Sequence, residues 1–307
     1  MGSSVQNTDG GPTPRRYGNV TVLVGAQEGR YPDGNTLVVR GGSQTLLFDP
    51  SLSIFEQGPS AAAGIDAVVL SHVHEDHIPG LVHFTDRPVF VHHEDHPALA
   101  SMEGLLRAYG YDDIVEEWRR ELLEDFHVSF RPDATAYDDG ATWDLGGGVR
   151  VTAVHLPGHT SGHCGLLVEP DGFFYVADIE LTGFGPFYGD ATSDLERFEA
   201  SLARCRDIEA RWYGTFHHKG VVEGSGTFRR ELDAFAAVIE RREQELLAEL
   251  ATPRTLDELA HHRFLYRPHV ELNFLFAVER RSAALHVAKL LRQGRVQEVE
   301  PGRYRRV

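Results

Sequence analysis

"IDAVVLSHVHEDH", residues 65–77, joins an apolar run to a segment crowded with ionisable side chains. The run at 65–71 predicts a buried β-strand, because it is short, apolar and rich in β-branched residues. His72 and His74 follow two positions apart, so both face the same side of an extended segment. Asp76 and His77 begin the next turn. Crowding these groups at a strand end gives no structural benefit unless they share a cation, so the stretch predicts a metal site.

Three other predicted strands also end in groups that bind metals. His159 follows "TAVHLPG", Asp178 follows "FFYVA", and the pair His217 and His218 follows "WYGTF". Strand ends at one edge of a sheet lie close in space, so these side chains are expected to converge with the first group. Imidazole and carboxylate are ligands for Zn²⁺, Fe²⁺ or Mn²⁺, and no pair of thiolates indicates an iron–sulfur or structural zinc site.

Composition indicates an ordinary globular protein of 307 residues, of which 41% are hydrophobic and 25% charged. Residues 251–307 carry 11 Lys and Arg against 6 Asp and Glu, whereas residues 1–250 carry 19 against 40. An acidic body of this kind disfavours nucleic acid as a partner without excluding it, because phosphate contacts need cations. No apolar run is long enough for a membrane span. Cys164 and Cys205 form no disulfide framework, which favours a reducing cytoplasm.

The order of the predicted elements divides the chain into three parts. Residues 1–16 are expected to form a flexible leader. Residues 17–250 alternate strands with helices, including a helix at 193–208 with Ser193 as N-cap and a long amphipathic helix at 227–250. Residues 251–307 give helices followed by a hairpin that turns at Pro301-Gly302, the order of a winged-helix-like unit.

The motifs "HVHEDH" (72–77), "PGHTSGH" (157–163), "VAD" (176–178) and "FHHKG" (216–220) resemble the ordered metal motifs of the metallo-β-lactamase superfamily. The resemblance covers about residues 20–250 and implies an αββα sandwich, an α/β fold, with a two-metal site at its edge. It implies that one metal is bound by His72, His74 and His159. It implies a second bound by Asp76, His77 and a later histidine, with Asp178 bridging both. Zinc is the expected metal, with iron or manganese as alternatives.

Two departures from the family pattern bear on this assignment. Ala177 precedes Asp178 where the family usually has glycine, and "HHKG" replaces the usual Gly-His-Gly. Alignment of the residues that follow favours His218 over His217 as the last ligand, and it places Lys219 beside the site, where its charge could meet an anionic substrate group. In the Gly-rich loop "TGFGPFYG" (182–189), Phe184, Phe187 and Tyr188 are candidates to line a substrate pocket, with plain core packing as the alternative.

The resemblance implies hydrolysis, because two metals lower the pKa of a shared water and polarise the oxygen under attack. Asp76 is the expected catalytic carboxylate that orients this nucleophile. The chain looks closest to the lactamase-β-like subgroup related to glyoxalase II, which includes thioesterases and single-strand endoribonucleases. We therefore expect a hydrolase of a small-molecule ester, thioester or lactone, with an RNA phosphodiesterase as the alternative. A metal-binding protein with vestigial catalysis is a third interpretation, and the sequence leaves a homodimer open.

Overall fold

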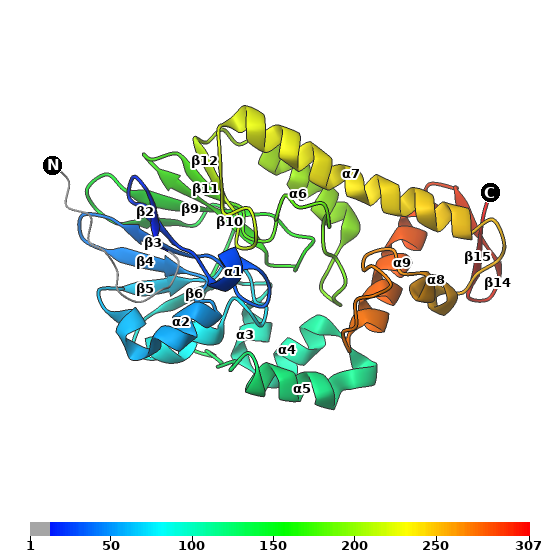
Figure 1. Cartoon of the computed structure of the whole chain (residues 1–307), viewed down its shortest axis with the longest axis horizontal. Coiled ribbons are helices and arrows are strands. Elements are labelled where there is room, and N and C mark those ends of the chain that lie inside the picture. The colour runs from blue at the N-terminus through cyan, green and yellow to red at the C-terminus, as the bar shows by residue number, and fades with distance from the viewer. Residues whose placement is uncertain (1–12) are drawn as a thin grey trace.

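The computed structural model describes residues 13–307, and two β-sheets form its centre (Figure 1). The first sheet has the order β1-β2-β3-β4-β5-β6-β7. Its strands are β1 (Arg15–Tyr17), β2 (Val20–Leu23), β3 (Thr36–Arg40), β4 (Thr45–Phe48), β5 (Ala67–Val69), β6 (Val89–His92) and β7 (Thr135–Tyr137). The first four are antiparallel neighbours, and β4 to β7 run parallel. The predicted leader thus lies mostly outside the described residues, and its last two residues belong to β1.

The second sheet has the order β13-β12-β11-β10-β9-β8 and is antiparallel except for the pair β11 and β12. Its strands are β8 (Thr142–Asp144), β9 (Arg150–His155), β10 (Cys164–Glu169), β11 (Phe173–Tyr175), β12 (Trp212–Gly214) and β13 (Val221–Glu223). Side chains of both sheets, among them Val39 and Val151, form one buried cluster between them. The two sheets therefore pack face to face.

Helices cover the outer face of each sheet. On one side lie α2 (Leu52–Gln57), α3 (His96–Ala100), α4 (Met102–Tyr109) and α5 (Val115–Glu124), with 3₁₀ turns η1 (Gly58–Ala62), η2 (Pro79–Phe84) and η3 (Asp112–Ile114). On the other lie α6 (Leu195–Asp207) and α7 (Ser225–Glu249), while the single turn α1 (Ala26–Gly29) follows β2. This is the αββα arrangement expected from the sequence. Gly110 ends α4 with a φ of 66°, the left-handed conformation common at helix C-termini.

The start of α6 differs from the prediction. Its N-cap is Asp194, whose side chain accepts a hydrogen bond from Arg197 N at 2.9 Å. Ser193 instead donates its hydroxyl to the carbonyl of His159 at 2.7 Å and accepts from Asp190 N. The residue expected to cap the helix therefore connects the loop before α6 to the segment that carries His159.

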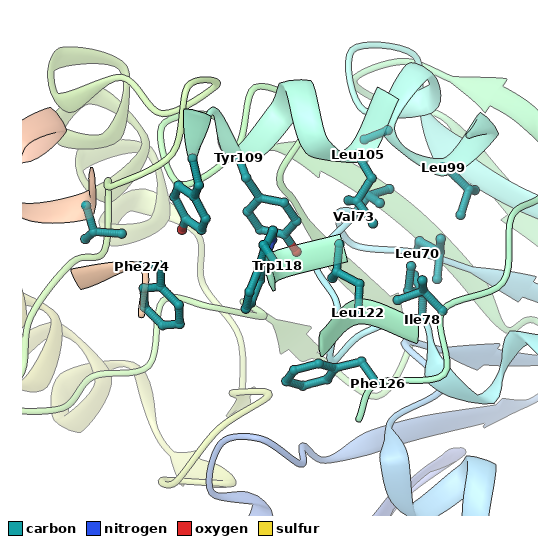
Figure 2. Packing of buried hydrophobic residues seen from close by; sticks show 14 of the residues in the cluster. Leu70, Val73, Ile78, Leu99, Leu105, Tyr109, Trp118, Leu122, Phe126 and Phe274 are labelled. Carbon is teal, nitrogen blue, oxygen red and sulfur yellow. The ribbon is translucent and has the colours of Figure 1, made fainter. Parts of the chain in front are cut away.

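The C-terminal segment has the predicted order, with α8 (Leu256–His262), α9 (Leu275–Arg292) and a hairpin of β14 (Val296–Glu300) and β15 (Arg303–Arg306). It packs into the same hydrophobic cluster as the helices under the first sheet, where Phe274 lies beside Trp118, which in turn packs against Tyr109 (Figure 2). The ring centroids of Trp118 and Phe274 are 5.4 Å apart. This segment therefore shares its core with the rest of the chain, and the winged-helix comparison stays a prediction. No helix among residues 13–307 is long and apolar enough to cross a membrane.

Candidate metal centre and its pocket

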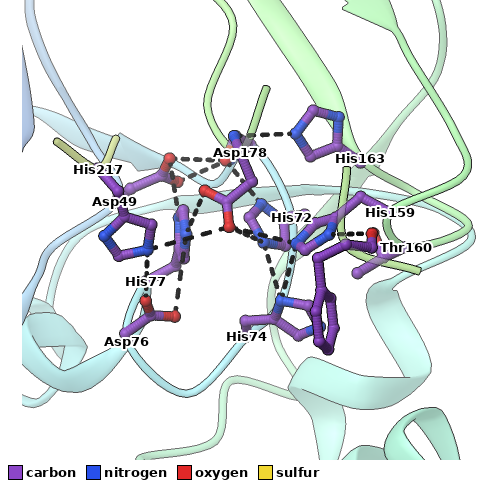
Figure 3. A network of polar contacts seen from close by, with 12 residues as sticks. Asp49, His72, His74, Asp76, His77, His159, Thr160, His163, Asp178 and His217 are labelled. Atoms are coloured by element: carbon purple, nitrogen blue, oxygen red, sulfur yellow. Dashed lines mark hydrogen bonds and ion pairs between the residues drawn. The ribbon is translucent and has the colours of Figure 1, made fainter. Parts of the chain in front are cut away.

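Four of the expected ligands form the first group of metal-binding side chains. The possible ligand atoms of His72, His74, His159 and Asp178 all lie within 4.8 Å of one another, and all four residues are buried. His72 follows β5, His159 follows β9 and Asp178 follows β11, so three strand ends converge as predicted (Figure 3). The Nδ1 atom of His74 lies 3.2 Å from His72 Nε2 and 3.0 Å from His159 Nε2.

A second group lies beside the first and contains Asp76, His77 and His217. The Nε2 atom of His217 lies 2.9 Å from Asp76 Oδ2, and the Nε2 atom of His77 lies 3.1 Å from Asp178 Oδ1. The other oxygen of Asp178 is 3.2 Å from His159 Nε2. Asp178 therefore faces both groups, which is the position expected of a bridging carboxylate.

The prediction that His218 belongs to this cluster is wrong. His217 is 2% exposed and points into the cluster, whereas His218 is exposed and has a φ of 52°. The backbone N–H of Phe216 donates to Ala177 O at 3.0 Å, and this register places His217 beside Asp178. His218 lies in the turn that follows, and its exposed side chain belongs to neither group of ligand atoms.

The outer ring nitrogens of these histidines face polar partners and form hydrogen bonds with them, except for His77 Nδ1, which makes no hydrogen bond within residues 13–307. His159 Nδ1 donates to Phe187 O at 3.1 Å, His74 Nε2 lies 2.9 Å from Asp190 Oδ2, and His217 Nδ1 donates to Gly29 O at 3.2 Å. His72 Nδ1 lies 3.0 Å from the hydroxyl of Ser71, which itself donates to Asp49. His77 Nδ1 lies 3.2 Å from Asp49 Oδ2. Partners of this kind fix the ring orientation and tautomer of metal-ligating histidines.

This pattern suits a cation at the centre of the cluster. With the outer nitrogens carrying hydrogen, the inner nitrogens of neutral His72, His74 and His159 direct lone pairs at one another. A tetrahedral zinc site with bonds of about 2.0–2.1 Å has ligand atoms about 3.4 Å apart. The separations of 3.0–3.2 Å among the inner nitrogens are close to this value. The residues therefore fit divalent metals in both groups.

Without a metal, protons occupy part of this space. Burial lowers the pKa of His74, but the hydrogen bond and charge of Asp190 outweigh it and raise the pKa to about 9. For His217 burial again lowers the pKa, while Asp76 and Asp178 raise it to about 10. Burial lowers the pKa of His72 well below its usual value, and the nearby His77 adds to this effect. A proton and a metal ion thus compete for the same nitrogens.

Two further buried residues support the ligands through hydrogen bonds. His163 is fully buried, and its Nε2 accepts a hydrogen bond from Asp178 N at 3.3 Å while its Nδ1 donates to Leu156 O. The side chain of Asp49 accepts from Ser71 N and from the hydroxyl of Tyr175, both at 2.7 Å. Ala177 has a φ of 45°, a region that favours glycine, which gives a physical reason for the glycine usual at this place in the family.

A cavity of about 280 Å³ opens onto both groups. Phe184 and Phe187 line it, in agreement with the prediction. Tyr188 does not: it is fully buried, with its hydroxyl 2.9 Å from His286 Nε2. Lys219 is also outside the cavity, because its ammonium group pairs with Glu231 of α7 at 3.3 Å. The expected roles of Tyr188 and Lys219 in contacting substrate are therefore corrected.

The sequence analysis missed several residues that line this cavity. They are mainly aromatic or acidic and come from distant segments: Tyr31, Glu75, Tyr109, Tyr111, Trp118, Glu180, Asp190, Tyr266, Leu272 and Phe274. Asp190 also holds His74 and accepts from the hydroxyl of Tyr111 at 2.6 Å. Its position at the end of the loop after Asp178 was the only available signal. Nothing in the sequence distinguishes the aromatic residues from ordinary core.

Comparison with known proteins agrees with this geometry. Residues 30–218 match the family model of the metallo-beta-lactamase superfamily. The chain belongs to this superfamily. Members of the superfamily are metal-dependent hydrolases, and the two His/Asp groups fit the dinuclear metal site of that class of enzyme.

Two curated relatives of the superfamily differ in activity. An atrochrysone carboxyl ACP thioesterase of Claviceps purpurea is 26% identical over 253 residues, or 79% of this chain and 67% of the relative. A ribonuclease Z of Mycobacterium marinum is 29% identical over 154 residues, or 45% of this chain and 53% of the relative. The chain thus spans about two thirds of one relative and about half of the other.

Solved structures of the superfamily share the fold over most of the chain. A metallo-beta-lactamase family protein of Thermus thermophilus has a TM-score of 0.68 at 23% identity, covering 94% of this chain and 99% of that protein. A beta-lactamase domain protein of Burkholderia ambifaria has a TM-score of 0.70 at 17% identity, covering 96% and 93%. Because both cover nearly all of this chain, the shared architecture extends beyond the residues of the family match.

Proposed function

We propose that the protein is a dinuclear metal-dependent hydrolase that cleaves an ester, thioester or lactone of a small molecule, with zinc as the preferred metal. The first ion would be held by His72, His74 and His159, and the second by Asp76, His77 and His217, with Asp178 between them. Bound ions of this kind polarise a carbonyl oxygen and lower the pKa of a water molecule.

We assign to Asp76 the role of orienting the attacking water and accepting its proton. Burial raises its pKa, but the charge of His77 and the hydrogen bond from His217 outweigh burial and lower the pKa overall. Asp76 is therefore an ionised acceptor at neutral pH. Because His217 Nδ1 donates to Gly29 O, its Nε2 and the nearby Oδ2 of Asp76 would both face the second ion, which leaves the other oxygen of Asp76 to orient the water and take its proton.

The residues that line the cavity favour a small uncharged substrate over RNA. Among the described residues that line it, none is Lys or Arg, and aromatic rings supply most of the apolar surface. A polyanion such as RNA is bound through cations along its backbone, whereas an uncharged acyl group needs only an apolar cavity. The thioesterase of Claviceps purpurea supports a thioester among the candidate bonds.

An RNA phosphodiesterase is the second candidate. The ribonuclease Z of Mycobacterium marinum supports it, and aromatic rings such as Tyr266 and Phe274 could stack on unpaired bases. The basic character of residues 251–307, with 11 Lys and Arg against 6 Asp and Glu, favours the same candidate.

A hydrolysis screen of the metal-loaded protein tests both candidates. The substrates are acyl thioesters, esters, lactones and single-stranded RNA, and Asp178→Ala serves as the inactive control for each. We expect turnover of thioesters or esters that Asp178→Ala lacks. Cleavage of RNA alone, falling steeply with salt as counterion release requires, would favour the second candidate.

A further inference from the structure

Two loops that are far apart in the sequence meet above the metal centre and form the outer walls of the cavity. The first is residues 182–190, after Asp178, and the second is residues 263–274, between α8 and α9. The rings of Phe184 and Tyr266 contact each other across the two loops, with centroids 5.2 Å apart. The position of this pair sets the size of the space available to a substrate.

Glu279 of α9 holds the second loop. Its side chain is 1% exposed and accepts hydrogen bonds from three consecutive backbone N–H groups. The distances are 2.8 Å from Phe264 N, 3.1 Å from Leu265 N and 2.8 Å from Tyr266 N. A buried carboxylate is costly unless such donors satisfy it, so the carboxylate and the loop each depend on the other. Tyr266 is thereby fixed at the cavity.

Arg242 of α7 holds the first loop. Its side chain is 2% exposed and donates to the carbonyl oxygen of Phe184 at 2.6 Å, to the hydroxyl of Tyr188 at 3.0 Å and to the carbonyl oxygen of Pro186. The next carbonyl of the loop, that of Phe187, accepts from His159 Nδ1. The same loop therefore carries one wall of the cavity and the acceptor that orients a proposed metal ligand.

The charges around the cavity restrict what it can accept. Glu75 is hydrogen-bonded by the hydroxyls of Tyr31 and Tyr109, and Asp190 by that of Tyr111. The side chain of Glu180 also faces the cavity. These carboxylates disfavour an anionic group, while the faces of the surrounding rings favour a flat apolar one.

From these contacts we propose that Arg242 and Glu279 are positioning residues that hold Phe184 and Tyr266 against each other as one aromatic wall of the cavity, and that this arrangement selects substrates with an uncharged aromatic acyl group. The inference rests on the proposed function and adds the class of acyl group. It also assigns the C-terminal segment a role in selectivity, because Glu279, Tyr266 and Phe274 all belong to it.

Steady-state kinetics on N-acetylcysteamine thioesters test the selectivity. The wild-type protein should show a kcat/KM at least about tenfold higher for the 2-naphthoyl than for the acetyl thioester, the effect of a contact worth about 1.4 kcal/mol. It should also prefer the pentanoyl thioester to the succinyl thioester, which is of similar length but carries a carboxylate. Equal rates within either pair would overturn the selectivity.

Variants with matched controls test the two positioning residues. Glu279→Gln should raise KM for the naphthoyl thioester about tenfold and leave kcat for the acetyl thioester and metal content unchanged, while the exposed Glu300→Gln changes neither. Arg242→Lys keeps the charge but loses the fork that bonds two carbonyls, so it should also raise KM for the naphthoyl thioester, with the exposed Arg241→Lys as its control. Because the same loop orients His159, Arg242→Lys should in addition weaken metal binding. Equal changes in KM for the naphthoyl and acetyl thioesters in Glu279→Gln would contradict the assignment.

Binding of 2-naphthamide to the full-length protein separates this inference from the proposed function. The amide is neutral and carries the same ring, and calorimetric titration follows it without hydrolysis. Tyr266→Ala, which keeps the loop anchor, should weaken binding about tenfold, whereas Tyr266→Phe should retain it. If no thioester or ester is hydrolysed, the proposed function fails, and binding of the amide still tests whether Tyr266 lines the binding cavity. If Tyr266→Ala binds the amide as tightly as the wild type, the proposed role of Tyr266 in selectivity is wrong.

Discussion

The Nε2 atom of His217 lies 2.9 Å from the Oδ2 atom of Asp76, and this contact completes the second group of ligand atoms. Since His218 is exposed, the adjacent histidines provide their own matched control. We predict that His217→Ala binds only about one metal ion per chain, whereas His218→Ala binds the same number as the wild type. Elemental analysis after reconstitution measures this directly. Loss of an ion from His218→Ala alone would reverse the assignment.

Asp178 and His163 should differ in their importance for the metals. Asp178→Ala removes the carboxylate that faces both groups, so it should lose both ions and all hydrolytic activity. His163→Ala removes only a contact to the backbone of Asp178, and a loss of about ten- to hundredfold in activity is expected for a supporting residue. Metal content and rate, measured on both variants, should therefore separate them. Equal behaviour would show that Asp178 is not the bridging group.

Asp190 should affect metal affinity without touching the metal. Its Oδ2 lies 2.9 Å from His74 Nε2, and Asp190→Asn replaces this charged acceptor with a neutral amide. We expect metal affinity to fall about ten- to hundredfold, as for other partners of metal-ligating histidines. Asp207→Asn makes the same chemical change at an exposed residue and serves as the control. Competition with a chromophoric chelator gives both affinities, and an Asp190→Asn value equal to the control would refute the role.

Metal binding should release protons, and its affinity should rise with pH. The pKa of His74 is raised to about 9 and that of His217 to about 10. Burial lowers the pKa of His77, but the charges of Asp178 and Asp76 outweigh it and raise this pKa well above its usual value, so all three histidines are protonated at pH 7 in the metal-free protein. Loading both ions at pH 7 should therefore release about three protons, and the apparent affinity should increase until the pH exceeds these pKa values. Calorimetry in buffers of different ionisation enthalpy counts the protons. A binding enthalpy at pH 7 that is the same in all buffers would contradict the predicted release of protons.

Much of the metal centre follows from local sequence. The spacing of His72, His74, Asp76 and His77 after an apolar strand predicts ligands on one side of a segment, and the structure brings them together. His159 and Asp178 also follow strands, and their convergence depends only on those strands ending at the same edge. The order of strands and helices and the hairpin at Pro301-Gly302 were predicted from local strand, helix and turn signals, whereas the αββα architecture was implied by the family resemblance.

Tertiary packing alone decided the rest. His217 and His218 are indistinguishable by residue type, and the register that places Phe216 N against Ala177 O selects His217. Tyr266 and Phe184 are 82 positions apart in the printed sequence, so only the packing of α7 and α9, through Arg242 and Glu279, brings their rings into contact. Sequence periodicity specifies which face of an element is apolar, but register and loop position depend on contacts between residues distant in the chain. The sequence by itself therefore determined the metal centre, and the tertiary structure decided its last ligand and the walls of its pocket.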